Sequence, residues 1–166
     1  MADDTPPDEA LHPALPLVLP VRPTREQIDR LEAAMLAAEA APGFVAPEIP
    51  LDHHHAGGLY ARQITIPAGT VLAGLPHKHA HLNVCIGDIT VWTEQGMRRL
   101  TGTHVVPSAP GARRVGLTHA DTVWVSIHVN PTGTTDEQEL AALLVETPHR
   151  LLDNRRQPNP GQELSP

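Results

Sequence analysis

Histidines stand at every second position in a short segment near the middle of this 166-residue chain. His77, His79 and His81 are followed at the same spacing by Asn83 and Cys85. In a β-strand this alternation would place all five side chains on one face, and the mostly apolar residues between them on the other. Imidazole nitrogens are good ligands for divalent transition metals at neutral pH. The spacing therefore predicts a strand with one face for metal binding and one for packing.

Three more histidines follow one another directly, shortly before the glycine pair Gly57–Gly58. Consecutive side chains of a strand point to opposite faces, so at most two of these three could reach one ion. The glycines indicate a loop. We therefore expect His53, His54 and His55 to lie at the surface or at the mouth of a site, and not to bind the metal.

The elements that would position these residues are short. Thr24 with Gln27, and Thr135 with Gln138, form two capping boxes, which predict helices over about 25–40 and 134–147. Between them, runs rich in apolar and β-branched residues alternate with turn residues such as Gly87–Asp88. Strands are expected at 59–66, 70–72, 77–86, 89–93, 97–100, 103–106, 113–117 and 122–129. So many short strands predict an all-β sandwich or barrel with a helix at each end.

Several segments, taken in order, resemble small cupin-like proteins encoded by bacteriophages and prophages. They begin at Tyr60 (YARQITIPAGT), His77 (HKHAHLN), Gly87 (GDITV), Pro110 (PGARRV) and Asp121 (DTVWVSIH). The resemblance spans about residues 48–146 and implies a cupin-type jelly-roll β-barrel. The expected organisation is an extended or disordered proline-rich arm at 1–23, a helix and linker at 24–47, the barrel at 48–133, a helix at 134–147 and a flexible tail at 148–166.

The same resemblance implies a metal site. Cupins supply a His-x-His pair and a Glu from a first motif and a His from a second; His77 and His81 fall near the second histidine and the glutamate of the first motif. Where the second motif has its histidine, this chain has Arg114, so we expect His128 on the last strand to replace it. His79 is a further candidate ligand. The expected cofactor is a divalent transition metal, with iron, manganese, nickel and zinc all compatible with imidazole ligands.

Arginines are the candidate ligand-binding residues. Arg113 and Arg114 follow a Pro-Gly turn, and one of them is expected to face the inside of the barrel. An arginine in that place either pairs with a carboxylate for structure or binds an anionic ligand. Arg62 and Tyr60, on one face of an early strand, would either extend such a pocket or lie on its exposed rim.

Composition limits the partners. The formal net charge is −7 and there is no block of Lys or Arg, so neither nucleic acid nor an anionic membrane is an expected partner. The one cysteine, Cys85, excludes an internal disulfide and fits a reducing compartment. The chain has no long apolar run and no basic start. We therefore expect a soluble, cytoplasmic protein that binds a small molecule and forms a homodimer or a larger homo-oligomer.

Together these features predict a small cupin-like metal-binding protein that binds or acts on a small anionic substrate. Whether it is an enzyme is left open by the sequence. The alternative is a non-enzymatic ligand-binding or phage-associated accessory barrel, with or without metal. A third possibility is that the arm at 1–23 mediates oligomerisation around an inert barrel.

Overall fold

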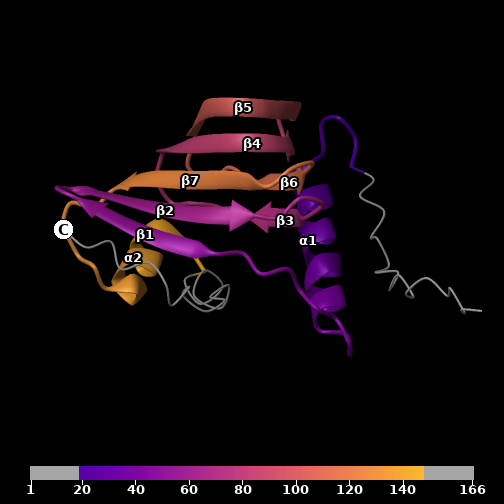
Figure 1. Ribbon diagram of the computed structural model, residues 1–166, viewed down its shortest axis with the longest axis horizontal. Coiled ribbons are helices and arrows are strands. Elements are labelled where there is room, and N and C mark those ends of the chain that lie inside the picture. The colour runs from indigo at the N-terminus through magenta and orange to yellow at the C-terminus, as the bar shows by residue number, and fades with distance from the viewer. Residues whose placement is uncertain (1–18, 148–166) are drawn as a thin grey trace, which may run out of the picture.

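The computed structural model describes residues 19–147, so residues 1–18 of the expected arm and the expected tail at 148–166 lie outside the described residues. The elements, in chain order, are α1 (Arg25–Glu39), β1 (Leu51–Ala56), β2 (Leu59–Ile66), β3 (Val71–Gly74), β4 (His81–Thr93), β5 (Gly96–Ser108), β6 (Arg114–Thr118), β7 (Thr122–Val129) and α2 (Glu137–Leu144). All seven strands belong to one antiparallel sheet, with one helix before it and one after it (Figure 1). The predicted all-β fold class with a helix at each end is confirmed.

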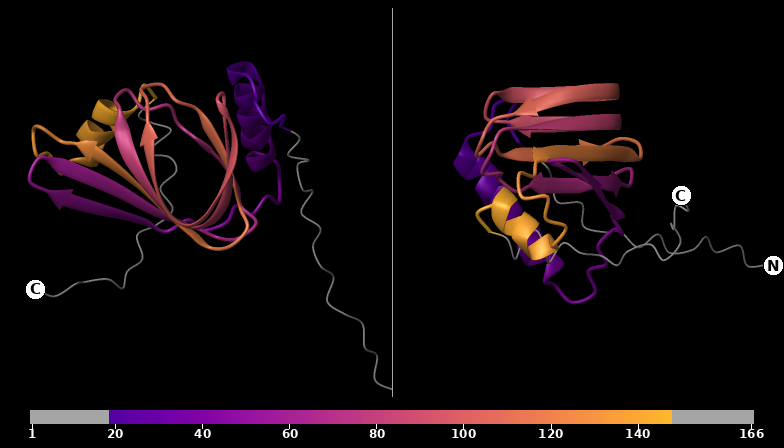
Figure 2. Two further views of the ribbon diagram at one scale, coloured as in Figure 1. Left: turned by 90° about the horizontal axis from the view of Figure 1, so that it is seen from above. Right: turned by 90° about the vertical axis from the view of Figure 1, so that its left-hand side faces the viewer.

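Strand β4 is the central strand of the sheet and pairs with three other strands. β5 pairs with it along its whole length. On the other edge, residues 82–86 of β4 pair with β7 and residues 89–92 pair with β6. β2 and β1 extend the sheet beyond β7, and β3 extends it beyond β6. The sheet therefore divides at the middle of β4 and curls into a half-barrel, with a concave surface and an outer surface (Figure 2).

The bend in β4 lies at Gly87, where the sequence predicts a turn. Gly87 has a φ of 147° and pairs with Gly102 of β5. A Cβ atom at Gly87 would lie 2.4 Å from Thr122 Oγ1 and 2.8 Å from the carbonyl oxygen of Asp121. The glycine lets β4 pass close to the start of β7 without breaking its pairing with β5. The expected turn is therefore wrong, and the expected strands at 97–100 and 103–106 are one strand, β5.

Helix α1 covers the outer surface of the part of the sheet formed by β3 and β6. Ile28 of α1 is fully buried against Trp92 of β4 and Val115 of β6. The predicted capping box is present: the Thr24 hydroxyl accepts a hydrogen bond from the backbone N–H of Gln27, whose side chain accepts one from the backbone N–H of Thr24. Local sequence thus starts the helix, and its apolar face fixes where it packs.

Helix α2 lies at one end of the concave surface. Leu140 and Leu144 of α2 pack with Tyr60 of β2 and with Leu75 in one buried cluster. This helix therefore closes the end of the half-barrel where β2 and β7 pair, and does not cover the outer surface.

The N-cap of α2 differs from the expected one. The cap is Asp136 and not Thr135. Its carboxylate accepts hydrogen bonds from the backbone N–H groups of Gln138 and Glu139, both at 2.9 Å. A carboxylate in this position satisfies two free N–H groups and also interacts favourably with the positive end of the helix dipole, which a threonine hydroxyl does less well.

The consecutive histidines lie in a strand, so the loop expected there is wrong. β1 and β2 form a hairpin around Gly57–Gly58, in which His53 pairs with Arg62. His54 and His55 are exposed, as expected. No described helix has the length and apolar character needed to cross a membrane.

Candidate metal centre

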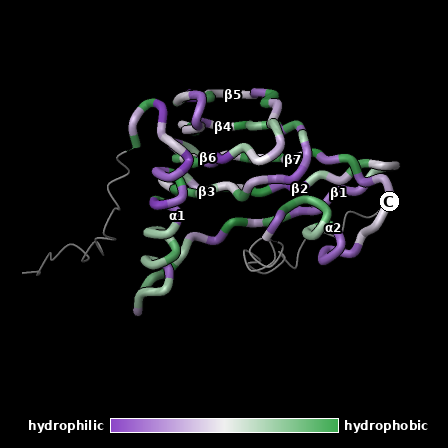
Figure 3. The backbone as a smooth tube through the Cα atoms, turned by 180° about the vertical axis from the view of Figure 1, so that it is seen from behind, coloured by the Kyte–Doolittle hydropathy of each residue, from purple (hydrophilic) through white to green (hydrophobic). Residues whose placement is uncertain are grey.

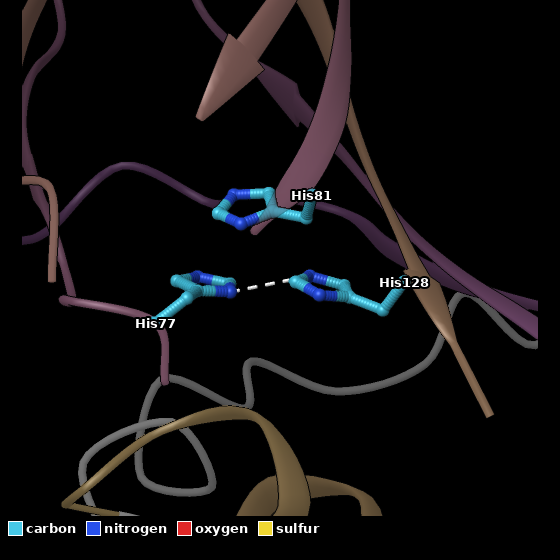
Figure 4. Close-up of side chains that lie close together, drawn as sticks. All are labelled: His77, His81 and His128. Carbon is cyan, nitrogen blue, oxygen red and sulfur yellow. Dashed lines mark hydrogen bonds between the residues drawn. The ribbon is translucent and has the colours of Figure 1, made fainter. Parts of the chain in front are cut away.

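Three imidazoles meet on the concave side of the sheet, next to α2 (Figure 4). They belong to His77, His81 and His128, and one nitrogen of each lies within 4.8 Å of the other two. Their ring centroids are 4.4, 4.5 and 4.8 Å apart. The structure thus brings together three of the four histidines that the sequence predicts as ligands. The fourth, His79, is exposed and lies outside this group.

His77 is held in place by the end of α2. It lies in the segment between β3 and β4, not in the strand expected at 77–86, and forms a β-bridge with Val145. The next residue, Lys78, donates a hydrogen bond from its backbone N–H to Leu144 O and another from Nζ to Ala142 O, both at 2.7 Å. The packing of α2 against the sheet therefore sets the position of a site residue.

His81 begins β4 and its tautomer follows from its hydrogen bond. Its Nδ1 lies 3.0 Å from the backbone carbonyl oxygen of His79. A carbonyl oxygen only accepts, so Nδ1 carries the proton and Nε2 carries the lone pair. Such a bond to the second ring nitrogen is the usual way in which a metal-binding histidine is oriented.

His128 comes from β7, opposite Tyr60 of β2 in the ladder. Its Nε2 lies 3.1 Å from Nδ1 of His77, in hydrogen-bond contact (Figure 4). One of these two nitrogens must donate and the other accept, so a proton occupies the space between two potential metal ligands. For both nitrogens to bind a metal, that proton would have to move to the other nitrogen of its own ring.

Burial keeps the cluster uncharged. It lowers the pKa of His77 from 6.5 to about 3 and the pKa of His128 to about 4, with the neighbouring imidazoles as the second cause. Burial also lowers the pKa of His81, partly offset by its backbone hydrogen bond. The positive charges of Arg62 and Arg114 lower the pKa of His77 further. All three rings are therefore neutral at neutral pH, the state in which imidazole binds metals.

The three nitrogens fit a single ion. Two imidazole nitrogens that bind one zinc-like ion at about 2.0–2.1 Å lie about 3.0–3.4 Å from each other. The pair from His77 and His128, at 3.1 Å, already meets this spacing. The nitrogen of His81 lies within 4.8 Å of both, a gap that small ring rotations can close. In the described part of the chain, no carboxylate or thiol belongs to the group, so its donors are all nitrogen.

Known proteins resemble this chain only distantly. No family model and no curated protein matches it. Among solved structures, KdgF from Halomonas sp. is 19% identical over 51% of this chain and 82% of its own, with a TM-score of 0.43. A cupin domain from Bordetella pertussis is 16% identical over 53% and 99%, with a TM-score of 0.41. The Cnp3 cupin domain of Schizosaccharomyces pombe is 17% identical over 55% and 67%, with a TM-score of 0.43.

The fold is a curled antiparallel sheet in the form of a half-barrel with two helices, which is consistent with a cupin jelly-roll. Two long strands, β4 and β5, run together through both parts of the sheet. The predicted fold class is confirmed in this form. What the site does has to be inferred from its own residues, because one fold hosts many chemistries.

The two consecutive arginines after the Pro-Gly turn point to opposite sides of the sheet. Arg113 is 4% exposed and donates hydrogen bonds to Asp29 and Glu32 of α1 and to the carbonyl oxygen of Gly74. This is the structural pairing with carboxylates that the sequence left open. Arg114 begins β6 on the concave side, where its positive charge acts on His77.

Arg114 and Arg62 carry positive charge next to the cluster, and neither has a carboxylate partner within residues 19–147. Arg114 donates one hydrogen bond, at 2.7 Å, to the hydroxyl of Ser108. The side chain of Arg62 makes no hydrogen bond or ion pair with any described residue. Burial lowers the pKa of both guanidiniums, although they stay charged at neutral pH. Two desolvated cations without counter-charges form a site that attracts anions.

Tyr60 lies in the wall of the site. Its side chain is buried, and its hydroxyl lies 2.9 Å from Nδ1 of His53. Burial raises the pKa of Tyr60 to about 12, so the phenol is uncharged. This contact was not predicted from the sequence, although the Gly57–Gly58 pair is typical of a tight hairpin; in that hairpin His55 lies opposite Tyr60, and His53 lies two residues further along the same face.

A polar network below the cluster was also missed. The Asn83 side chain accepts hydrogen bonds from Trp124 Nε1 at 3.1 Å and from Ser126 Oγ at 2.9 Å, and donates one to Val106 O at 3.2 Å. It thereby joins β4, β7 and β5 just beneath His81. The alternation in sequence placed Asn83 on the ligand face, but its partners come from distant strands that only the fold brings near.

Proposed function

We propose that this chain binds one divalent transition metal through His77, His81 and His128 and presents it to a small anionic ligand. The observation that carries the proposal is the convergence of three neutral imidazoles with no carboxylate among them. Three protein ligands leave coordination positions open, which is typical of a site that binds further molecules and not of a closed structural site.

The anionic character of the ligand is inferred from the arginines. Arg62 and Arg114 supply two positive charges beside His77, and neither has a carboxylate partner among the described residues. Their planar guanidinium groups suit carboxylate or phosphate oxygens. A bound divalent ion would add charge of the same sign and act as a Lewis acid toward such a ligand.

Metal binding is tested on protein purified without an affinity tag. Elemental analysis and calorimetric titration with Zn²⁺ should give one ion per chain, and this ion should be lost in His77→Ala, His81→Ala and His128→Ala. His54→Ala, an exposed histidine of β1, is the matched control and should keep its metal. Stoichiometric binding in all three cluster variants would refute the proposed centre. His79→Ala decides separately whether that residue contributes.

Anion binding is tested on protein loaded with Co²⁺, whose visible absorption reports changes at the metal. Acetate and inorganic phosphate should shift the spectrum, and Arg62→Gln and Arg114→Gln should weaken the response by about tenfold or more, because each loses a charged hydrogen-bond donor. Arg98→Gln, at an exposed arginine of β5, is the control. If neither acetate nor phosphate changes the visible spectrum of the Co²⁺-loaded protein, the result would favour a binding or accessory role without an anionic ligand.

A further inference from the structure

One surface of the sheet is apolar and is not covered by any helix of residues 19–147. On β2, β7, β4 and β5, the side chains that alternate with those of the concave surface point outward. The exposed apolar ones, with their exposed fractions, are Leu59 (46%), Leu82 (46%), Ile86 (47%), Val105 (63%) and Val129 (63%). Half-buried apolar side chains fill the space between them: Val84, Val123, Val125 and Ile127. We call these nine side chains the outer face.

The ladder places these residues next to one another. Val84 pairs with Val105 on one side and with Val125 on the other, and Leu82 pairs with Ile127. The neighbouring outward positions on β2 and β5 are small or polar and uncharged: Ala61, Gln63, Thr65, Thr103 and Pro107. Charges on this side of the sheet lie at its margins, where Asp88 and Arg99 form an ion pair with each other at 2.7 Å and Asp52 of β1 accepts a hydrogen bond from Gln63. Apolar residues colour much of β4 and β7 green in Figure 3. The outer face is therefore a contiguous apolar patch and not a scatter of single exposed residues.

The two parts of the sheet differ in how their outer surfaces are covered. Behind β3 and β6, α1 buries Trp92 and Val115, with Val71 and Leu117 packed around them. Behind β2, β7 and β4, no described helix does this, and α2 packs at the concave side instead. The sequence predicts the alternate residues of the histidine segment as a packing face. Leu82, Val84 and Ile86 share one side of β4, but Leu82 and Ile86 are exposed, and no described helix packs on them.

We propose that the outer face binds the same face of a second copy of this chain. Two apolar sheets pack face to face at about 10 Å, with their strands roughly aligned. A charged partner would find no counter-charge on the nine residues of the outer face, and Asp88 and Arg99 at its margin are already paired with each other. An apolar face whose charges are confined to its margins is complementary to itself, as a two-fold dimer requires.

The size of the face is sufficient. Four strands about 4.8 Å apart and about seven residues long give a face of roughly 450 Å² in projection. The accessible area of a surface with protruding side chains is larger than its projection, and β1 adds a rim. Specific dimers bury about 600 Å² per partner at the lower end of their range. The accessible area of the outer face together with β1 is therefore of the same order as the area that such dimers bury.

The proposal is tested by sedimentation velocity over a range of protein concentrations. The full chain should be a dimer at micromolar concentration. Leu82→Glu and Val105→Glu should each weaken the dimer by about 100-fold or more, because in a two-fold interface each substitution buries two unpaired charges. Leu36→Glu on α1 and Val45→Glu are matched controls, since these residues are 47% and 73% exposed but lie elsewhere. Both controls should remain dimeric.

Circular dichroism and tryptophan fluorescence show whether each variant is folded. The two substitutions lie on different strands, so the test can still be made if one variant fails to fold. A full chain that is monomeric at every concentration would overturn the proposal, including the case in which residues 1–18 or 148–166 cover the face. A dimer that survives both Leu82→Glu and Val105→Glu would also overturn it, because the contact would then lie elsewhere, for example along the free edge of β5. Neither result bears on metal binding, which is measured separately.

Discussion

Acid should destabilise the metal-free protein through the histidine cluster. In the unfolded chain a histidine titrates near 6.5, whereas burial lowers the pKa of His77 to about 3 and that of His128 to about 4 in the folded state. Between these values the unfolded chain binds protons that the folded chain does not. The stabilisation is therefore fully present above pH 6.5 and is lost progressively as the pH falls toward 4.

The magnitude follows from the two shifts. Each histidine that is protonated only in the unfolded state costs about 1.4 kcal/mol per pH unit. Between pH 7 and pH 5 the free energy of unfolding should fall by about 2 kcal/mol for each of His77 and His128, or about 4 kcal/mol for both. This loss is a large share of the stability of an ordinary domain, so the effect is easily measured.

The assay is urea unfolding at pH 7, 6 and 5 in the presence of a chelator, followed by tryptophan fluorescence. His128→Gln removes one titrating ring, so the loss between pH 7 and pH 5 should be about half that of the parent protein. His54→Gln, which removes an exposed histidine, should leave the loss as in the parent. A free energy of unfolding that stays constant from pH 7 to pH 5 would show that the cluster is not buried in its neutral form. An unchanged slope in His128→Gln would refute the role of that ring.

Three further predictions concern the fold, and urea unfolding at pH 7 checks each. Gly87→Ala should cost about 3 kcal/mol or more, because the new Cβ would lie 2.4–2.8 Å from side-chain and backbone atoms of the β7 start; a neutral result would mean that the bend does not need glycine. Arg113→Met should cost about 3–5 kcal/mol, because it leaves the buried Glu32 carboxylate without this cation, whereas Arg99→Met at an exposed pair should cost much less. Asp136→Ala should cost about 1 kcal/mol through loss of the α2 cap, and an unchanged midpoint would contradict the assigned cap.

Local patterns in the sequence predicted the elements whose ends are set locally. The capping box at Thr24 and Gln27 predicted the start of α1, and the alternating apolar residues predicted β7 at 122–129 with the bounds that the structure has. The bend of β4 could not be predicted in the same way. It depends on the close approach of Thr122, which is distant in sequence, and a glycine followed by aspartate is more often a turn.

The candidate site was predicted in part, for a similar reason. Alternation and the cupin resemblance pointed to His77 and His81, and the place of the last strand pointed to His128. Alternation alone could not separate His79 from the others, because residues 77–80 precede β4 and do not follow its geometry. Nor could it show which of Arg113 and Arg114 faces inward, since that depends on where α1 places its carboxylates.

The most direct measurement of the metal centre is X-ray absorption spectroscopy of the protein loaded with one equivalent of Zn²⁺. We expect three imidazole nitrogens at about 2.0–2.1 Å, with the remaining positions filled by water or a small anion. The His128→Ala variant should show one imidazole fewer. A spectrum dominated by oxygen ligands, or one that His128→Ala leaves unchanged, would contradict the proposal that these three rings hold a single ion.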